Sequence, residues 1–164
     1  MTQTSSLLND SGLRLRPWSM EDVDYAEAWY SDIEVLRNSE GTEKPYSREK
    51  IEEMYRYLSA RGELYIIEVE ESGSWKPIGD ACLMPDSLPI VIGEPNYRSK
   101  GYGKRALALL ISRARSKGWK ELRVKGVYSN NENSIKLFLS LGFFQTGKIL
   151  NKNGVTEYSY SLNL

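Results

Sequence analysis

Hydrophobic residues alternate with polar ones in several short segments of the chain and recur every three or four positions in others. Alternation is typical of a strand with one buried face, and the longer spacing is typical of an amphipathic helix. Together these patterns predict the element order βααβββαβαββ. The expected strands are 13–17, 64–69, 78–83, 88–93, 122–127, 143–150 and 155–162, the expected helices are 20–30, 47–60, 104–116 and 131–141, and a short turn is expected at 32–36.

Turn and cap residues mark the ends of these elements. Ser19 and Ser47 are suited to cap the first two helices, because a serine hydroxyl accepts a bond from an unpaired amide of the first turn. Gly118 ends the third helix, and Asn153-Gly154 has the sequence of a tight hairpin turn between the last two strands. Strands and helices mixed in this order indicate an α+β (mixed α/β) fold.

The chain has 164 residues, which suits one ordinary domain, and no repeat or linker interrupts the pattern. We expect a flexible N-terminal tail over residues 1–12 and one domain over residues 13–164. The tail lacks the basic start and apolar stretch of a secretory signal. No apolar run approaches the roughly 20 residues that span a bilayer. We therefore expect a cytoplasmic protein without a membrane partner.

The amino-acid composition excludes several kinds of catalytic and metal site. The chain has no histidine, which excludes a serine–histidine triad and a typical zinc site, so no metal is expected. Its one cysteine, Cys82, cannot form an internal disulfide and lies in an apolar alternation typical of a core residue. Catalysis must therefore use carboxylates, tyrosines, lysines, backbone amides or a bound cofactor.

The charges are unevenly distributed, although the formal net charge is zero. Residues 21–53 carry 11 acidic and 4 basic side chains, whereas residues 98–125 carry 10 basic side chains and one acidic side chain. The two blocks can be solvated helix faces. They also allow one half of the chain to attract a polyanion and the other half a cation.

A loop with two glycines is expected just before the helix at 104–116. The first-turn amides of a helix lack intrahelical partners, and glycines let a backbone approach a phosphate closely. A pyrophosphate is the natural ligand, with Arg98 and Lys100 as cationic donors. The stretch also imitates the GxGxxA fingerprint of dinucleotide-binding folds, but it lies in mid-chain and no acidic residue ends the next strand to bind a ribose. The sequence of the loop is Arg98-Ser99-Lys100-Gly101-Tyr102-Gly103-Lys104-Arg105-Ala106.

At these residues the chain resembles the GNAT (GCN5-related N-acetyltransferase) superfamily, whose signature is Arg/Gln-x-x-Gly-x-Gly/Ala after a central strand. The resemblance covers nearly the whole chain and includes the lead-in at 95–98 and a second block at 131–143 that ends in Leu-Gly-Phe. The chain is most similar to the ribosomal-protein N-terminal and aminoglycoside acetyltransferases. The resemblance implies a twisted, mostly antiparallel sheet of about seven strands flanked by four helices, with acetyl-coenzyme A as cosubstrate.

The resemblance also implies which residues hold the cofactor. Backbone amides from Arg98 through Lys104 would bind its pyrophosphate. The strand end at Ile92, Gly93 and Glu94 would bind the pantetheine arm and polarise the acetyl carbonyl.

The second block would contribute further cofactor contacts. Asn131 would contact the cofactor arm, with helix capping as its other possible role. Ser134 and Lys136 would lie nearby, and a solvated helix face is the alternative for Lys136. The full implied set is Ile92, Gly93, Glu94, Arg98, Ser99, Lys100, Gly101, Tyr102, Gly103, Lys104, Asn131, Ser134 and Lys136.

Direct acetyl transfer needs an unprotonated amine, a polarised thioester carbonyl and a proton for the leaving thiolate. Keeping a lysine-like amine neutral at pH 7 costs about 4 to 5 kcal/mol. Relatives often carry a tyrosine acid in the helix before Leu-Gly-Phe, but Phe138 occupies that position and is expected in the core. Water, Tyr128 or Tyr158 would then protonate the thiolate, and Glu94 or Glu157 would be the base.

The family builds its acceptor pocket in the first third of the chain, which is acidic here. The resemblance therefore implies transfer of acetyl from acetyl-coenzyme A to a primary amine of a small cationic molecule or a peptide N-terminus, by a monomer or homodimer. The missing tyrosine leaves a non-catalytic acyl-coenzyme A binding module as the alternative. No nucleic-acid partner is expected, because the basic stretch lacks interleaved aromatics. Aromatic residues in the acidic part include Trp29, Tyr30, Tyr46, Tyr55 and Tyr57.

Overall fold

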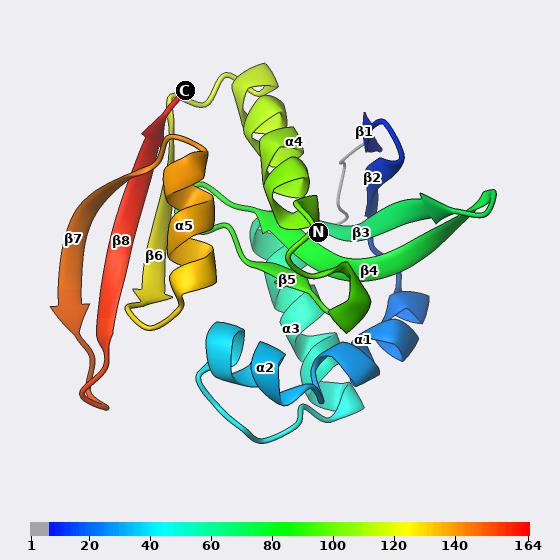
Figure 1. The fold of residues 1–164 in the computed structure, drawn as a ribbon, viewed down its shortest axis with the longest axis horizontal. Helices are drawn as coiled ribbons and strands as arrows, with labels where there is room; N and C mark the ends of the chain where they lie inside the picture. The colour runs from blue at the N-terminus through cyan, green and yellow to red at the C-terminus, as the bar shows by residue number, and fades with distance from the viewer. Residues whose placement is uncertain (1–6) are drawn as a thin grey trace.

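The computed structural model describes residues 7–164, and its strands form two antiparallel sheets (Figure 1). The first sheet has the strand order β1-β2-β3-β4-β5, and the second has the order β6-β8-β7. The first sheet contains β1 (Leu8–Asp10), β2 (Leu13–Pro17), β3 (Glu63–Glu71), β4 (Ser74–Leu83) and β5 (Ile90–Ile92). The second contains β6 (Glu121–Tyr128), β7 (Phe144–Leu150) and β8 (Thr156–Asn163).

Helices connect the strands on both sides of the first sheet (Figure 1). The Ser47 hydroxyl accepts a bond from the Lys50 amide and so caps the helix at Arg48–Arg61 as expected. Among the described residues, no helix has the length and apolar character needed to cross a bilayer. The helices are α1 (Val23–Trp29), α2 (Ile33–Val35), α3 (Arg48–Arg61), α4 (Tyr102–Ser116) and α5 (Glu132–Ser140), and the short 3₁₀ or π segments are η1 (Met20–Asp22), η2 (Leu36–Glu40) and η3 (Pro95–Tyr97).

The observed order contains the expected βααβββαβαββ and confirms the mixed fold class, with two differences. The expected sheet of about seven strands is divided into sheets of five and three strands in residues 7–164. Residues 8–10 were expected in a flexible tail, but they form β1, which pairs with β2. Gly12 turns the chain with a φ of 80°, and Arg105 binds both the carboxylate and the carbonyl of Asp10. The start of the expected tail, residues 1–6, lies outside the described residues.

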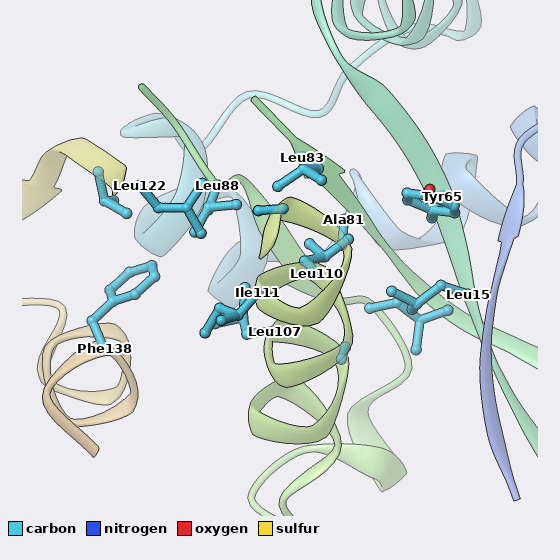
Figure 2. Close-up of a cluster of buried hydrophobic side chains, with 14 of the residues drawn as sticks. Leu15, Tyr65, Ala81, Leu83, Leu88, Leu107, Leu110, Ile111, Leu122 and Phe138 are labelled. Carbon is cyan, nitrogen blue, oxygen red and sulfur yellow. The ribbon is translucent and has the colours of Figure 1, made fainter. Parts of the chain in front are cut away.

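Helix α4 joins the two sheets into one hydrophobic core (Figure 2). Its buried side chains recur every three or four residues and so form one face of the helix. Figure 2 shows Leu107, Leu110 and Ile111 of α4 between Leu15 of the first sheet and Phe138, which packs with the second sheet. The apolar stripe of α4 therefore holds the two sheets on either side of the helix.

A second core lies on the opposite face of the five-stranded sheet, under α1 and α3. Leu64 and Ile66 of β3 belong to this core, whereas Tyr65 and Ile67 belong to the core around α4. Successive residues of a strand face opposite sides of a sheet. Burial on both faces therefore explains why β3 reads as a continuous apolar run.

One buried carboxylate, that of Asp80 on β4, lies among the apolar side chains of the second core. It is 3% exposed and accepts hydrogen bonds from the hydroxyls of Tyr30 and Tyr55. Burial raises the pKa of Asp80 to about 7, although the two tyrosine bonds act in the opposite direction. The negative charge of Glu40 raises the pKa of Asp80 further. Asp80 is thus easier to protonate in the folded protein than in the unfolded chain.

The buried Asp80 should make folding stability fall as pH rises. Between pH 4 and pH 7 the unfolded chain has lost the Asp80 proton while the folded protein still holds it, so deprotonation favours unfolding over that range. Asp80→Asn cannot ionise and should lack this contribution, which amounts to up to about 4 kcal/mol. Urea unfolding of both proteins at pH 4, 5.5 and 7 measures the difference. Equal pH dependence in both proteins would contradict the raised pKa.

Candidate functional site

Two cavities lie beside β5 and share part of their lining. The first, about 310 Å³, is bounded by β5, the glycine loop, α5 and the α2–η2 segment. The second, about 350 Å³, is bounded by β4, β5, β6, α3 and η2. They meet over β5, which pairs with β4 but, within residues 7–164, forms no ladder with β6. The shared lining residues are Asn38, Ser39, Ile90, Val91, Asn131 and Ser134.

The glycine loop turns sharply at one side of the first cavity. Ser99 and Gly101 have φ values of 58° and 86°, in the left-handed region, and Gly101 directly precedes α4. The Arg105 amide donates back to the Gly101 carbonyl. The amides from Ser99 through Lys104 donate to no group of residues 7–164. The loop therefore offers a row of free donors next to the positive end of the α4 dipole.

Gly103 faces the apolar wall of the first cavity. A methyl group added there would lie 3.6 Å from Leu137 and 3.9 Å from Ile90. These are ordinary contacts, so the position has room for alanine, as the family pattern Gly/Ala allows. The apolar wall continues along Ile92. The first cavity thus has polar amides at one end and aliphatic side chains along its length.

Arg98 does not offer its guanidinium as a free donor to a phosphate, contrary to the expectation from sequence. The guanidinium binds the carbonyls of Ile92 and Gly93 and forms ion pairs with Asp32 at 3.2 Å and Glu34 at 3.0 Å. Arg98 therefore fastens α2 to the end of β5. The sequence could not show this, because both carboxylates lie more than sixty residues earlier in the chain.

Two other cations lie at the loop without an ion pair among the described residues. Lys100 and Lys104 are both exposed, and neither belongs to an ion pair there, unlike Arg98 and Arg105. Lys104 and Ser99 line the first cavity. The positive charge available to an anion at this loop therefore comes from the lysines.

The end of β5 is fixed by bonds within the protein. The amides of Gly93 and Glu94 both donate to the Ile78 carbonyl, at 2.7 and 3.0 Å. Ile78 is the extra residue of a β-bulge in β4. These two amides are thus engaged within the protein. Ile92, by contrast, lines the first cavity.

The residues expected from the second block lie near both cavities, with one exception. Asn131 caps α5 by accepting a bond from the Ser134 amide, and its side-chain nitrogen donates to the Asn38 carbonyl. Capping, the alternative role, is therefore present. Asn131 and Ser134 line both cavities, whereas Lys136 is exposed and lines neither.

The second cavity carries negative charge and phenol groups. Its ionisable lining side chains include the carboxylates of Glu40 and Asp80 and the amine of Lys125. Tyr30 and Tyr57, two aromatics of the acidic first third, also line it. Trp29, Tyr46 and Tyr55 do not line it, and Trp29 and Tyr55 are core residues. Phe138 is buried in the first core as expected and closes part of the cavity wall.

Of the three expected catalytic residues, Tyr128 and Glu157 are neighbours on β6 and β8, whereas Glu94 lies at the end of β5. Tyr128 lines the second cavity. Glu157 lies opposite Tyr128 on β8 and accepts a bond from the Asn151 side chain at 2.7 Å. The Glu94 carboxylate accepts a bond from the Trp29 indole at 3.1 Å. Neither glutamate lines a cavity.

Sequence analysis missed Asp80, which with Glu40 supplies the carboxylates in the lining of the second cavity. The signal was present, since Asp80 interrupts the apolar run Ile78–Leu83 between Gly79 and Ala81. An acidic residue in a strand buried on both faces points to a buried carboxylate. Its contacts with Tyr30 and Tyr55 could not be read from the sequence.

Comparisons with known proteins agree with this architecture. The sequence profile of the Acetyltransferase (GNAT) domain matches residues 12–144. An uncharacterised protein of Methanocaldococcus jannaschii is 28% identical over 162 residues, which cover 94% of this chain and 32% of that protein. The chain spans about a third of the length of the curated relatives it matches.

Two solved structures have the same fold. A domain from Methanocaldococcus jannaschii aligns with a TM-score of 0.78 and 25% identity over 93% of this chain and 98% of that one. The yncA protein of Salmonella typhimurium, solved with its cofactor acetyl-coenzyme A, aligns with a TM-score of 0.69 and 20% identity over 93% of this chain and 94% of that one. Because the profile covers most of the chain, including the glycine loop and the α5 block, the chain belongs to the GNAT family of acetyltransferases.

Proposed function

We propose that this protein transfers an acetyl group from acetyl-coenzyme A to a primary amine, by direct attack while both substrates are bound. The observation that carries the proposal is the meeting of two cavities over β5. A thioester held in the first cavity and an amine held in the second can approach each other at that junction. Holding two reactants in contact lowers a barrier by roughly 7 to 11 kcal/mol.

The polar and apolar parts of the first cavity match those of coenzyme A. The free amides from Ser99 to Lys104 and the unpaired charges of Lys100 and Lys104 suit a pyrophosphate. The aliphatic wall formed by Ile90, Ile92 and Leu137 suits the apolar pantetheine arm. As the edge strand of its sheet, β5 also leaves backbone groups on one side for the amides of that arm.

The second cavity fits a cationic amine. Glu40 and Asp80 place two carboxylates against one lysine in its lining. The phenols of Tyr30, Tyr57 and Tyr128 can accept bonds from an ammonium group. The similarity of the two sequence blocks to ribosomal-protein N-terminal and aminoglycoside acetyltransferases supports a peptide N-terminus or a small polyamine-like molecule as acceptor.

Tyr128 is the candidate to deliver the proton that the leaving thiolate needs. It lines the second cavity, while Phe138 occupies the position where many relatives carry a tyrosine. A water molecule could replace Tyr128 in this role. Tyr158, the other phenol considered, packs against Tyr160 and the first core.

Removing the two loop lysines should weaken coenzyme A binding. The double variant Lys100→Gln/Lys104→Gln loses two exposed charge contacts to the phosphates, which together are worth roughly 1 to 2 kcal/mol, or about 5- to 30-fold in Kd. Calorimetry with coenzyme A measures the change, and the affinity for pantetheine, which lacks the pyrophosphate, should not change. Lys152→Gln, in the exposed turn between β7 and β8, is the matched control. Unchanged Kd in the double variant would contradict the assignment of the loop.

The acetyl transfer itself can be tested with a mixed acceptor library. The purified protein is incubated with acetyl-coenzyme A and a panel of polyamines, aminoglycosides, peptides and neutral amines, and the products are identified by mass spectrometry. We expect acetylated primary amines, with the cationic acceptors preferred, and no product when coenzyme A replaces acetyl-coenzyme A. Binding of coenzyme A without any product across the panel would support the non-catalytic binding module. Absence of coenzyme A binding would overturn both functions.

A further inference from the structure

The carboxylate of Asp80 lines the second cavity, and the proposed function so far gives it no role in the chemistry. Its register partner on β5 is Val91, which lines both cavities. The Tyr55 hydroxyl donates to Oδ2 at 2.7 Å, and the Tyr30 hydroxyl lies 2.9 Å from Oδ2 and 3.2 Å from Oδ1. Asp80 is thus a firmly held carboxylate beside the strand over which the cavities meet.

No cation within residues 7–164 balances this carboxylate. The ion pairs among those residues do not include Asp80. The charge that acts on it is that of Glu40, which is also negative. A buried charge without a partner is costly. A positively charged group that enters the second cavity would supply the missing partner.

Several titratable or charged groups face Asp80 or share its cavity. Phenols approach it from the end of α1 and from α3, a carboxylate from η2, a thiol from its own strand, and an amine and a phenol from β6. Burial raises the pKa of the thiol to about 12 and raises the pKa values of the Tyr30 and Tyr55 phenols, so these groups stay neutral in the ordinary assay range of pH. The groups are Tyr30, Tyr55, Tyr57, Glu40, Cys82, Lys125 and Tyr128.

We propose that Asp80 is the base that accepts a proton from the ammonium group of the acceptor, and that Tyr30 and Tyr55 hold its carboxylate in place. This inference rests on the proposed function, because it needs an amine in the second cavity and a thioester in the first. It makes Asp80 a catalytic residue and the two tyrosines positioning residues.

After the acetyl transfer, one of the two protons lost by the amine nitrogen remains on Asp80. The ammonium group gives a proton to the carboxylate, and the freed lone pair of nitrogen forms a bond to the thioester carbon. The carbon–sulfur bond then breaks and its electron pair stays on sulfur. The second proton of the nitrogen goes to the thiolate, through Tyr128 or water, which yields an amide and a free thiol. Asp80 returns its proton to solvent before the next turnover.

The acidity of Asp80 suits this role. Burial raises its pKa to about 7, with Glu40 acting in the same direction and both tyrosines opposing it. A base works best when its pKa lies near the operating pH, because it is then both available and able to hold the proton. The buried Cys82 thiol has a pKa of about 12 and stays protonated. It does not compete for the proton.

Asp80 also differs from the two glutamates considered from the sequence. Glu94 and Glu157 accept bonds from Trp29 and Asn151, respectively, and neither lines a cavity. Asp80 lines the cavity that carries the acceptor in our proposal. Position therefore favours Asp80 as the proton acceptor.

The test is the pH profile of Asp80→Asn, with Asp86→Asn as the matched control in an exposed loop. For an ammonium acceptor at pH 7, kcat/KM should fall roughly 100-fold or more, since general bases contribute about 10²- to 10⁴-fold. The wild-type rate should rise with pH and level off near pH 7. The rate of the variant should keep rising toward the pKa of the acceptor, because only the free amine reacts. With an arylamine, which is neutral at pH 7, the variant should lose far less activity.

Two further measurements separate this role from a structural one. Tyr30→Phe and Tyr55→Phe each remove a bond that lowers the pKa of Asp80, so each should move the rising limb of the profile to higher pH. Coenzyme A affinity, measured by calorimetry, should be equal in all these proteins, and thermal unfolding should show that Asp80→Asn is folded.

The outcomes are distinct. If the wild-type protein acetylates amines and Asp80→Asn does so within twofold and with the same pH profile, the role of Asp80 is overturned while the proposed function stands. If the wild-type protein binds no coenzyme A, or acetylates no amine, the proposed function is overturned and the role of Asp80 with it.

Discussion

The burial of α4 between the two sheets is the packing interaction on which the site depends. One apolar stripe of α4 lies in a single core with side chains from both sheets. In the described residues β5 and β6, which both line the second cavity, form no ladder with each other. The same helix begins at the glycine loop, so the packing that joins the sheets also places the free amides of that loop at the first cavity.

Ion pairs between distant parts of the chain reinforce this arrangement. Arg98 joins the end of β5 to α2, Arg105 joins α4 to the carboxylate of Asp10, and Arg113 joins α4 to Glu63 of β3. Of these, only the Arg98 pair joins the acidic block of residues 21–53 to the basic block of residues 98–125, because Asp10 and Glu63 lie outside the acidic block. Cations that remain without an ion pair among residues 7–164 include Lys100 and Lys104 of the glycine loop, where a phosphate ligand is expected. These positive charges are therefore available to bind a phosphate.

The sequence was sufficient to predict the elements whose signals are local. Helix caps such as Ser47, the turn at Asn153-Gly154 and the periodicity of α4 each depend on residues a few positions apart. The strand at residues 8–10 was missed because it is short and depends on β2 and Arg105, which lies 95 positions away.

The same difference between local signals and long-range contacts applies to the site residues. The loop amides depend on a local motif, and the motif located them. The partners of Arg98 and the contacts of Asp80 with Tyr30 and Tyr55 join segments 25 to 66 positions apart. Only the fold brings these groups together, so the sequence assigned Arg98 to the ligand and overlooked Asp80. The sequence predicts an acceptor pocket in the acidic first third of the chain. Of the aromatics there, Tyr30 and Tyr57 line the second cavity, but the sequence did not distinguish them from core residues such as Trp29 and Tyr55.

The central claim is that the loop amides hold a pyrophosphate and so direct a thioester along β5 to the junction of the cavities. Backbone amide NMR during a titration with coenzyme A tests it most directly. The account predicts that the amide signals of residues 99–104 and 90–92 shift together and saturate at one Kd, while those of the distant β7–β8 turn stay unchanged. Binding that leaves the signals of residues 99–104 in place would contradict it.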